Sequence, residues 1–197
     1  MRTILPEHKN PALREIAREI SLSDIRGAPI KKLIAEMKAL LAKEEYGVAL
    51  AASQLGVPLR LFIVSGRALA RDRRNAPDEP ERHEATPHGE VPPPLPDPSR
   101  LGGRAEADQV YINPIVLKMS RTKKEKHEGC LSVRGKWGIV ARAEKTMLSS
   151  YDEKGQKTTR GASGFLAHVF QHEMDHLDGI LYTDKAAALY DDKPEKK

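Results

Sequence analysis

Gln171-His172-Glu173-Met174-Asp175-His176-Leu177-Asp178-Gly179 is the stretch around which we expect the chain to fold. His172 and His176 are four residues apart, so on an α-helix both imidazoles face the same side and can bind one metal ion. Glu173 follows the first histidine and can reach the water that such an ion would activate. This HExxH pattern therefore predicts a helix that carries a metal site with a carboxylate beside it.

The residues before this motif indicate that its helix is buried. Residues 165–170 are apolar almost all round, which is typical of a helix inside a core. An HExxH match also occurs by chance in ordinary amphipathic turns. Because two histidines and a glutamate in a buried helix need polar partners, a bound metal is the better interpretation.

Length and composition indicate one domain in a reducing compartment. The 197 residues are enough for a single core, and the net charge of +5 is mildly basic without showing nucleic-acid binding. The single cysteine, Cys130, excludes an intrachain disulfide. No apolar run is long enough to span a membrane, and no signal-peptide core is found. We therefore expect a cytoplasmic protein with no membrane and no specific nucleic-acid partner.

Helical and strand patterns do not alternate as in βαβ units. Apolar residues recur at helical spacing over residues 11–20 and 29–41. Strands are expected over residues 59–64, 109–118, 139–142, 145–152 and 156–160. The pattern predicts an α+β fold, in which antiparallel β-sheets pack around the central HExxH helix.

Residues 66–107 differ in composition from the rest of the chain. They contain eight of the fourteen prolines, mixed arginines and acidic residues, and no aromatic residue. Such a segment cannot bury enough apolar surface to offset the entropy lost on ordering. We predict a proline-rich surface insertion, extended or disordered, within one catalytic domain that covers residues 1–197 and ends in a flexible tail over residues 188–197.

The predicted metal site needs a third protein ligand. His168 lies on the same helical face, but three ligands along one straight helix converge poorly, because four residues add about 6 Å of rise. Cys130 is the better candidate. The alternative for a buried free cysteine is an inert residue of the core.

Three stretches, in this order, resemble the motifs of the peptide deformylase family. Residues 47–54 are similar to GxGxAAxQ, residues 128–132 match EGCLS, and residues 171–176 match QHExDH. The resemblance covers most of the chain outside residues 66–107. It implies a metal-dependent hydrolase of protein biosynthesis, which removes the formyl group from N-formylmethionine at the amino terminus of newly made polypeptides and releases formate.

The resemblance also implies which residues bind the metal. Cys130, His172 and His176 would hold one divalent ion. A thiolate ligand suits iron as well as zinc. Fe(II) is the expected native metal, and Zn(II), Ni(II) or Co(II) can occupy the site in a purified sample.

Three further residues would carry the reaction. Glu173 would take a proton from the attacking water and pass it to the departing amine. The side-chain amide of Gln54 and the backbone N–H of Leu131 would stabilise the oxyanion that develops during the attack.

Substrate recognition would combine backbone pairing with an apolar pocket for methionine. The edge at Gly47, Val48 and Ala49, with Gly129 opposite, is expected to pair with the peptide as an added strand. Pocket candidates on the helix before the ligands are Phe165, His168 and Val169, while Trp137 lies at the rim or in the core. Ala49 replaces the second glycine of its motif, and His168 is polar where an apolar residue is expected, so both put the substrate preference in question.

Two other functions fit parts of the pattern. A metallopeptidase would share HExxH, but a cysteine ligand argues against the common peptidase ligand sets. A non-catalytic protein that binds peptides or ribosomes would use the insertion and the basic residues 119–127, but the complete Cys-His-His-Glu set argues against it. The expected partners are N-formylmethionyl nascent peptides, with transient proximity to the ribosome.

Overall fold

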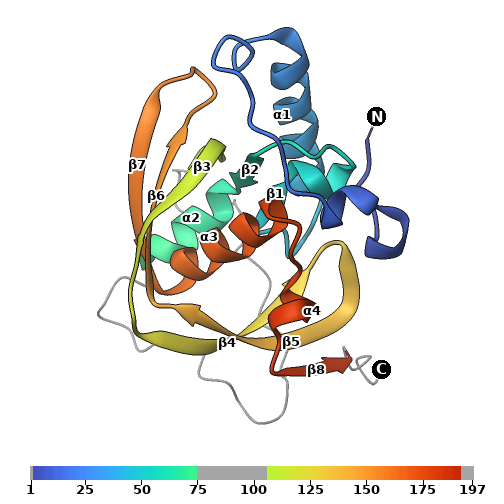
Figure 1. Ribbon diagram of the computed structural model, residues 1–197, viewed down its shortest axis with the longest axis vertical. Coiled ribbons are helices and arrows are strands. Elements are labelled where there is room, and N and C mark those ends of the chain that lie inside the picture. The colour runs from blue at the N-terminus through green and yellow to red at the C-terminus, as the bar shows by residue number, and fades with distance from the viewer. Residues whose placement is uncertain (1, 75–105, 192–197) are drawn as a thin grey trace.

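The computed structural model describes residues 2–74 and 106–191, shown in Figure 1. The helices of this part are α1 (Ala28–Leu41), α2 (Gly66–Arg74), α3 (Gly164–Leu177) and α4 (Tyr182–Lys185), with 3-10 turns η1 (Glu7–Lys9), η2 (Pro11–Arg14) and η3 (Ala52–Leu55). The strands are β1 (Ala49–Ala51), β2 (Leu61–Val64), β3 (Gln109–Met119), β4 (Lys123–Cys130), β5 (Val133–Ala143), β6 (Lys145–Tyr151), β7 (Lys157–Ser163) and β8 (Ala188–Asp191). None of these helices has the length and apolarity needed to cross a membrane.

The strands form two antiparallel sheets. One has the order β1-β2-β3-β6-β7 and the other the order β4-β5-β8. Helix α3 lies in the middle of the molecule, between these two groups of strands (Figure 1). The α+β class and the antiparallel sheets predicted from the sequence are confirmed.

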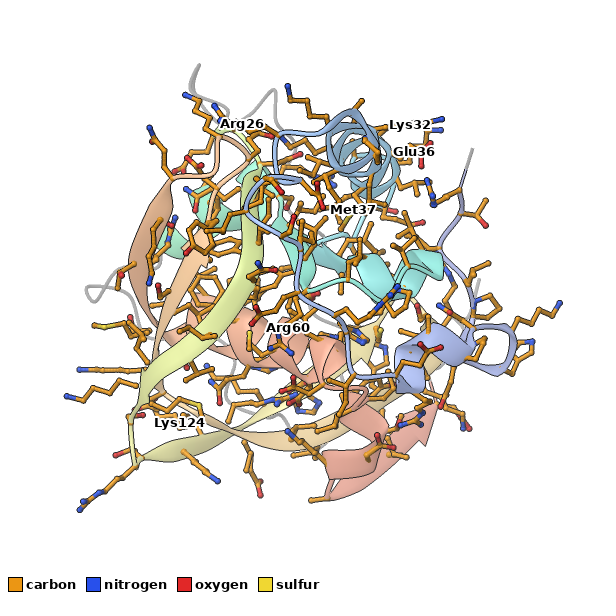
Figure 2. The ribbon with its side chains drawn as sticks, turned by 45° about the horizontal axis from the view of Figure 1, so that its top comes forward. Arg26, Lys32, Glu36, Met37, Arg60 and Lys124 are labelled. Carbon is orange, nitrogen blue, oxygen red and sulfur yellow. The ribbon has the colours of Figure 1, made fainter. Side chains whose placement is uncertain are left out.

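Helix α1 covers one side of the five-stranded sheet and begins within one residue of its predicted start. Its inner residues belong to a core cluster with β2 and β3, and Met37 at the centre is 0% exposed. Lys32 and Glu36 lie on the outer side of the helix, whereas Met37 is turned toward the sheet (Figure 2). This division follows from the helical spacing of apolar residues.

Helix α3 packs in a second core cluster, which includes an aromatic group. The rings of Phe62 and Tyr111 are stacked with centroids 4.7 Å apart, and Phe170 meets Tyr111 edge-on at 5.1 Å. The prediction of a buried helix is therefore confirmed. The helix ends at Leu177, and Gly179 follows as expected, with a φ of 73°, a left-handed conformation that glycine adopts without strain.

The helix predicted over residues 11–20 is wrong beyond η2. Ile16, expected on the inner face, is 76% exposed. The Ala17 N–H donates to the Leu177 carbonyl at 2.8 Å, and the Arg18 N–H donates to the Pro58 carbonyl at 2.9 Å. These hydrogen bonds to distant parts of the chain replace the helical ones, so tertiary contacts override the spacing here.

Two predicted irregular segments are partly ordered. Residues 66–74 form α2, with Ala68 and Leu69 buried at 0% and 1% exposure, so the insertion is neither extended nor disordered at its start. Its residues 75–105 lie outside the described residues. In the predicted tail, residues 188–191 form β8 and pair with β5, while residues 192–197 lie outside the described part.

Candidate metal centre and active site

The structure brings together the three residues predicted to bind a metal. The candidate ligand atoms of Cys130, His172 and His176 all lie within 4.8 Å of one another, and the Cys130 Sγ is 3.3 Å from the His176 Nε2. The cysteine comes from the end of β4 and the histidines from α3. Segments more than forty residues apart therefore meet at one point.

These three residues fit a tetrahedral ion. With bonds of about 2.3 Å to sulfur and 2.0–2.1 Å to nitrogen, such an ion holds two ligand atoms roughly 3.5 Å apart. The separation of the Cys130 and His176 atoms is close to that value. A thiolate with two imidazoles is a donor set for zinc or iron rather than for magnesium or calcium.

The local geometry of the hairpin β4–β5 places Cys130 at the site. The pairing of β4 with β5 shifts register between Glu128 and Cys130. A Cβ on Gly129 would lie 3.2 Å from two ring carbons of Trp137, so a glycine lets the indole pack against the backbone. Trp137 is only partly buried and therefore lies beside the metal-binding strand end.

The buried carboxylate of Glu128 contacts one ring nitrogen of His172. The Glu128 Oε2 is 2.7 Å from the His172 Nδ1, which leaves the other ring nitrogen for a metal. His168 contributes its Nε2 at 2.8 Å from the Glu128 Oε1. His168 thus contacts a carboxylate through one ring nitrogen, and its place in the methionine pocket stays a prediction.

Arg142 completes this buried network. Its guanidinium donates to both oxygens of Glu128 at 2.6 and 3.0 Å, and to Asp175 at 2.6 Å. Lys185 donates to the other oxygen of Asp175 at 2.6 Å. Burial opposes ionisation of Glu128, but hydrogen bonds from His168, His172 and Arg142 hold its pKa well below the usual value. Glu128 is therefore a fixed negative charge next to a metal ligand.

Our sequence interpretation gave these supporting residues no role. Glu128 and Asp175 stand inside two of the three motifs, so the motifs themselves held the signal. Arg142 has no such signal, because its place beside Glu128 depends on the pairing of β4 with β5.

Glu173 lies in α3, the helix that contains His172 and His176, and is 3% exposed. Its Oε2 is buried and has no hydrogen-bond partner among the described residues. Burial raises the pKa of Glu173 to about 7. An unpartnered buried carboxylate is costly for folding. The Glu173 carboxylate therefore has the properties of a group that exchanges a proton with a molecule bound at the site.

The side chain of Gln54 is held with its amide nitrogen toward Cys130. Its Oε1 accepts a hydrogen bond from the Ala51 N–H at 2.8 Å. Its Nε2 is therefore left to donate, and lies 3.5 Å from the Cys130 Sγ and 3.4 Å from the Ser132 Oγ. Leu131 lies between Cys130 and Ser132 in the chain, where β4 turns into β5.

The other predicted substrate residues lie in β1, directly before it, or in helix α3. Strand β1, which contains Ala49, is at the end of its sheet and pairs only with β2 in the described part of the chain. Val48, Phe165 and Val169 pack in the same core cluster, the first two only partly buried. Gly47 is confined by packing, because a Cβ there would lie 2.9 Å from Leu41 atoms.

Comparison with known families gives a match over nearly the whole chain. Residues 1–191 match the family model described as polypeptide deformylase. A peptide deformylase of Leptospira biflexa is 34% identical over 176 residues, which are 89% of this chain and 83% of the relative. One of Desulforudis audaxviator is 30% identical over 184 residues, 93% of each chain. The chain covers only 58% of peptide deformylase 1A, chloroplastic/mitochondrial, of Arabidopsis thaliana, at 34% identity.

Solved structures share the fold. The crystal structure of a peptide deformylase from Legionella pneumophila has a TM-score of 0.68 at 28% identity, covering 95% of this chain and 86% of that one. A class I type b peptide deformylase from Acinetobacter baumannii, crystallised with Met-Ala-Ser bound, has a TM-score of 0.69 at 26% identity, covering 94% of this chain and 99% of that one.

Proposed function

The chain belongs to the polypeptide deformylase family, and from this premise we propose how its residues share the reaction. Enzymes of this family are metal-dependent hydrolases that remove the formyl group from N-formylmethionine peptides. The observation that carries the assignment of residues is the meeting of Cys130, His172 and His176 next to the buried Glu173.

Cys130, His172 and His176 would hold the metal. A bound divalent ion supplies a Lewis acid that lowers the pKa of a water and polarises the formyl carbonyl. We propose Fe(II) as the native ion, because a thiolate with two imidazoles suits it. Glu128 would keep the ring of His172 oriented for this bond, supported by the 2.7 Å contact.

Glu173 would move the proton. Its carboxylate would accept a proton from the attacking water while the water oxygen bonds to the formyl carbon. It would return this proton to the nitrogen as the carbon–nitrogen bond breaks, which yields formate and a free amino terminus. Its burial and its unpartnered Oε2 support this role.

Gln54 and Leu131 would stabilise the oxyanion. The Ala51 N–H holds the oxygen of the Gln54 amide, so the Nε2 is presented to the site in advance. Preorganised donors of this kind are each worth about 2.7–4 kcal/mol of transition-state stabilisation. The Leu131 N–H would be the second donor, directly after Cys130 in the chain.

The peptide would bind along β1. The edge of this strand, with which no strand of the described residues pairs, supports addition of the substrate as a further strand, with Gly129 opposite. Val48, Phe165 and Val169 would give the methionine an apolar surface, which their common cluster supports. The contact of His168 with Glu128 supports a role in orienting His172 instead.

The wider assignments rest on the family. Its match over residues 1–191 supports one catalytic domain. A cytoplasmic location and transient proximity to the ribosome stay predictions, since the relatives include plant proteins named for chloroplasts and mitochondria as well as bacterial ones.

The test compares wild-type protein with Cys130→Ser. We expect wild type to bind about one equivalent of metal and to release formate from formyl-Met-Ala-Ser without backbone cleavage, and to leave unformylated Met-Ala-Ser intact. Cys130→Ser should lose both the metal and the formate release, as measured by elemental analysis and a formate assay. Full metal content in Cys130→Ser would contradict the ligand assignment, and cleavage of Met-Ala-Ser would indicate a peptidase.

The identity of the metal has its own test. With Fe(II) beside a thiolate, activity should fall in air and be preserved by Ni(II) or Co(II) substitution. Activity of the anaerobically purified protein that is indifferent to oxygen would count against iron.

A further inference from the structure

The amino-terminal segment contacts both loops that carry the proposed oxyanion donors. The Leu5 N–H donates to the backbone carbonyl of Gln54, and the Glu7 N–H donates to the backbone carbonyl of Ser132, each at 2.9 Å. Gln54 is one proposed donor itself, and Ser132 directly follows the other, Leu131. Two alternate residues of one short segment therefore link the two halves of the oxyanion site.

The segment is itself firmly held. The buried side chain of Asn10, 2% exposed, donates from its Nδ2 to the Ser53 carbonyl at 2.8 Å. The Asn10 N–H donates to the Glu7 carbonyl at 3.1 Å and closes the turn η1. Pro6 and Pro11 flank this turn and restrict its backbone. Residues 5–10 can thus act as a rigid connection between the loop of Gln54 and the loop of Leu131.

Direct contacts between the two loops are made by side chains: Leu131 packs against the core cluster that contains Ala52 and Leu55. Gln54 follows β1 of the five-stranded sheet, whereas Leu131 lies in the turn between β4 and β5 of the other sheet. The Gln54 Nε2 reaches this turn only at 3.4 and 3.5 Å. An oxyanion needs each donor within about 2.7–3.1 Å, so any bond that fixes the spacing of the two loops would bear on the reaction.

We propose that residues 5–10 are a positioning segment, which sets the separation between the Gln54 amide and the Leu131 N–H by holding the carbonyls of Ser53, Gln54 and Ser132. This inference rests on the proposed oxyanion roles of Gln54 and Leu131. The segment acts through the two donors.

The backbone offers a specific way to remove one of these bonds. Glu7 is the first residue of η1, a position that tolerates proline, and Pro6 before it has φ −68° and ψ 150°, which a following proline accepts. Glu7→Pro therefore deletes the N–H donated to Ser132 with little backbone change. It also deletes the carboxylate paired with Arg14 at 2.6 Å. Glu7→Ala is the matched control, because it loses the carboxylate and keeps the N–H.

Glu7→Pro should lower kcat for formyl-Met-Ala-Ser by about 10- to 100-fold relative to Glu7→Ala. KM and metal content should stay equal in the two variants, and amide hydrogen exchange in residues 128–133 should be faster only in Glu7→Pro. In a Gln54→Ala background the same substitution should cost much less, because the donor pair is already broken. An equal kcat in the two Glu7 variants, or a loss that is fully additive with Gln54→Ala, would overturn the inference.

A second variant covers the case in which Glu7→Pro does not fold. Asn10→Ala removes the bond to Ser53 and should also lower kcat with KM unchanged, whereas an unchanged kcat would overturn the inference. The outcome is separable from the proposed function. If wild type releases formate and these variants match it, only the positioning role fails, and if wild type releases none, the proposed function fails.

Discussion

Helices α1 and α3 are both 14 residues long, yet they use these residues in opposite ways. Helix α1 buries one apolar face and turns its charged side chains outward, as the exposed Lys32 shows in Figure 2. Helix α3 is buried on almost all sides, including the polar side chains of Gln171, Glu173, Asp175 and His176. One helix stabilises the fold, and the other carries groups that a core normally excludes.

The difference shows what a reactive centre requires of its surroundings. Charges near α1 pair at the surface, as Lys38 does with Glu153 at 2.9 Å, where ion pairs contribute little. Charges around α3 are removed from water, where Glu128 is stabilised by its ion pair with Arg142. We therefore expect substitutions to affect activity at α3 and stability alone at α1.

The largest effect is expected for Glu173→Gln. Loss of the proton-transferring carboxylate should lower kcat by about 10²–10⁴-fold. Stability should not fall, because the neutral amide cannot carry the negative charge that is buried in this helix. Steady-state formate release and urea unfolding measure the two quantities. Glu36→Gln on α1 is the control and should leave kcat unchanged. A wild-type kcat in Glu173→Gln would contradict the difference in function between the two helices.

Glu128→Gln should have the next largest effect. It leaves Arg142 buried with one charge partner fewer, so the free energy of unfolding should fall by about 3–5 kcal/mol. Metal affinity should weaken by about 10–100-fold, because His172 loses its charged support. Urea unfolding and metal titration test this. A variant as stable as wild type would show that the network is not needed for folding.

Met37→Ala sharpens the comparison from the side of α1. This side chain is fully buried, so its truncation should cost about 2–5 kcal/mol of unfolding free energy. Metal content and KM should be unchanged under conditions where the variant is folded. Loss of metal from the folded variant would mean that the two helices are not independent.

The smallest effect is expected for Glu153→Gln. It breaks the exposed pair with Lys38 on α1, which should change the unfolding free energy by less than about 1 kcal/mol. It makes the same chemical change as Glu128→Gln at an exposed position. A loss as large as that of Glu128→Gln would contradict the distinction between buried and surface pairs.

The spacing of residues along the sequence predicted the helices that depend on this spacing alone. Helix α1 was expected over residues 29–41 and spans Ala28–Leu41, because one apolar stripe fixes its buried face. The HExxH motif located α3, because residues four apart share one face of a helix. The convergence of Cys130 with the histidines was anticipated from the ordered motifs, and the ligand atoms do lie together.

What the sequence could not show depends on distant contacts. Helical spacing over residues 11–20 was misleading, because the Ala17 and Arg18 N–H groups bond to Leu177 and Pro58. Arg142 becomes part of the site only through the register of β4 with β5. The same is true of the bond from Glu7 to Ser132, which joins backbone atoms and leaves no trace in side-chain pattern.

The packing of Trp137 against Gly129 has a practical consequence. This indole is the single tryptophan of the chain and adjoins the residue before Cys130. Its intrinsic fluorescence therefore originates beside the reactive centre, without background from other indoles. Quenching by Co(II), or a shift in emission when a peptide docks, would report occupancy in real time on unlabelled protein.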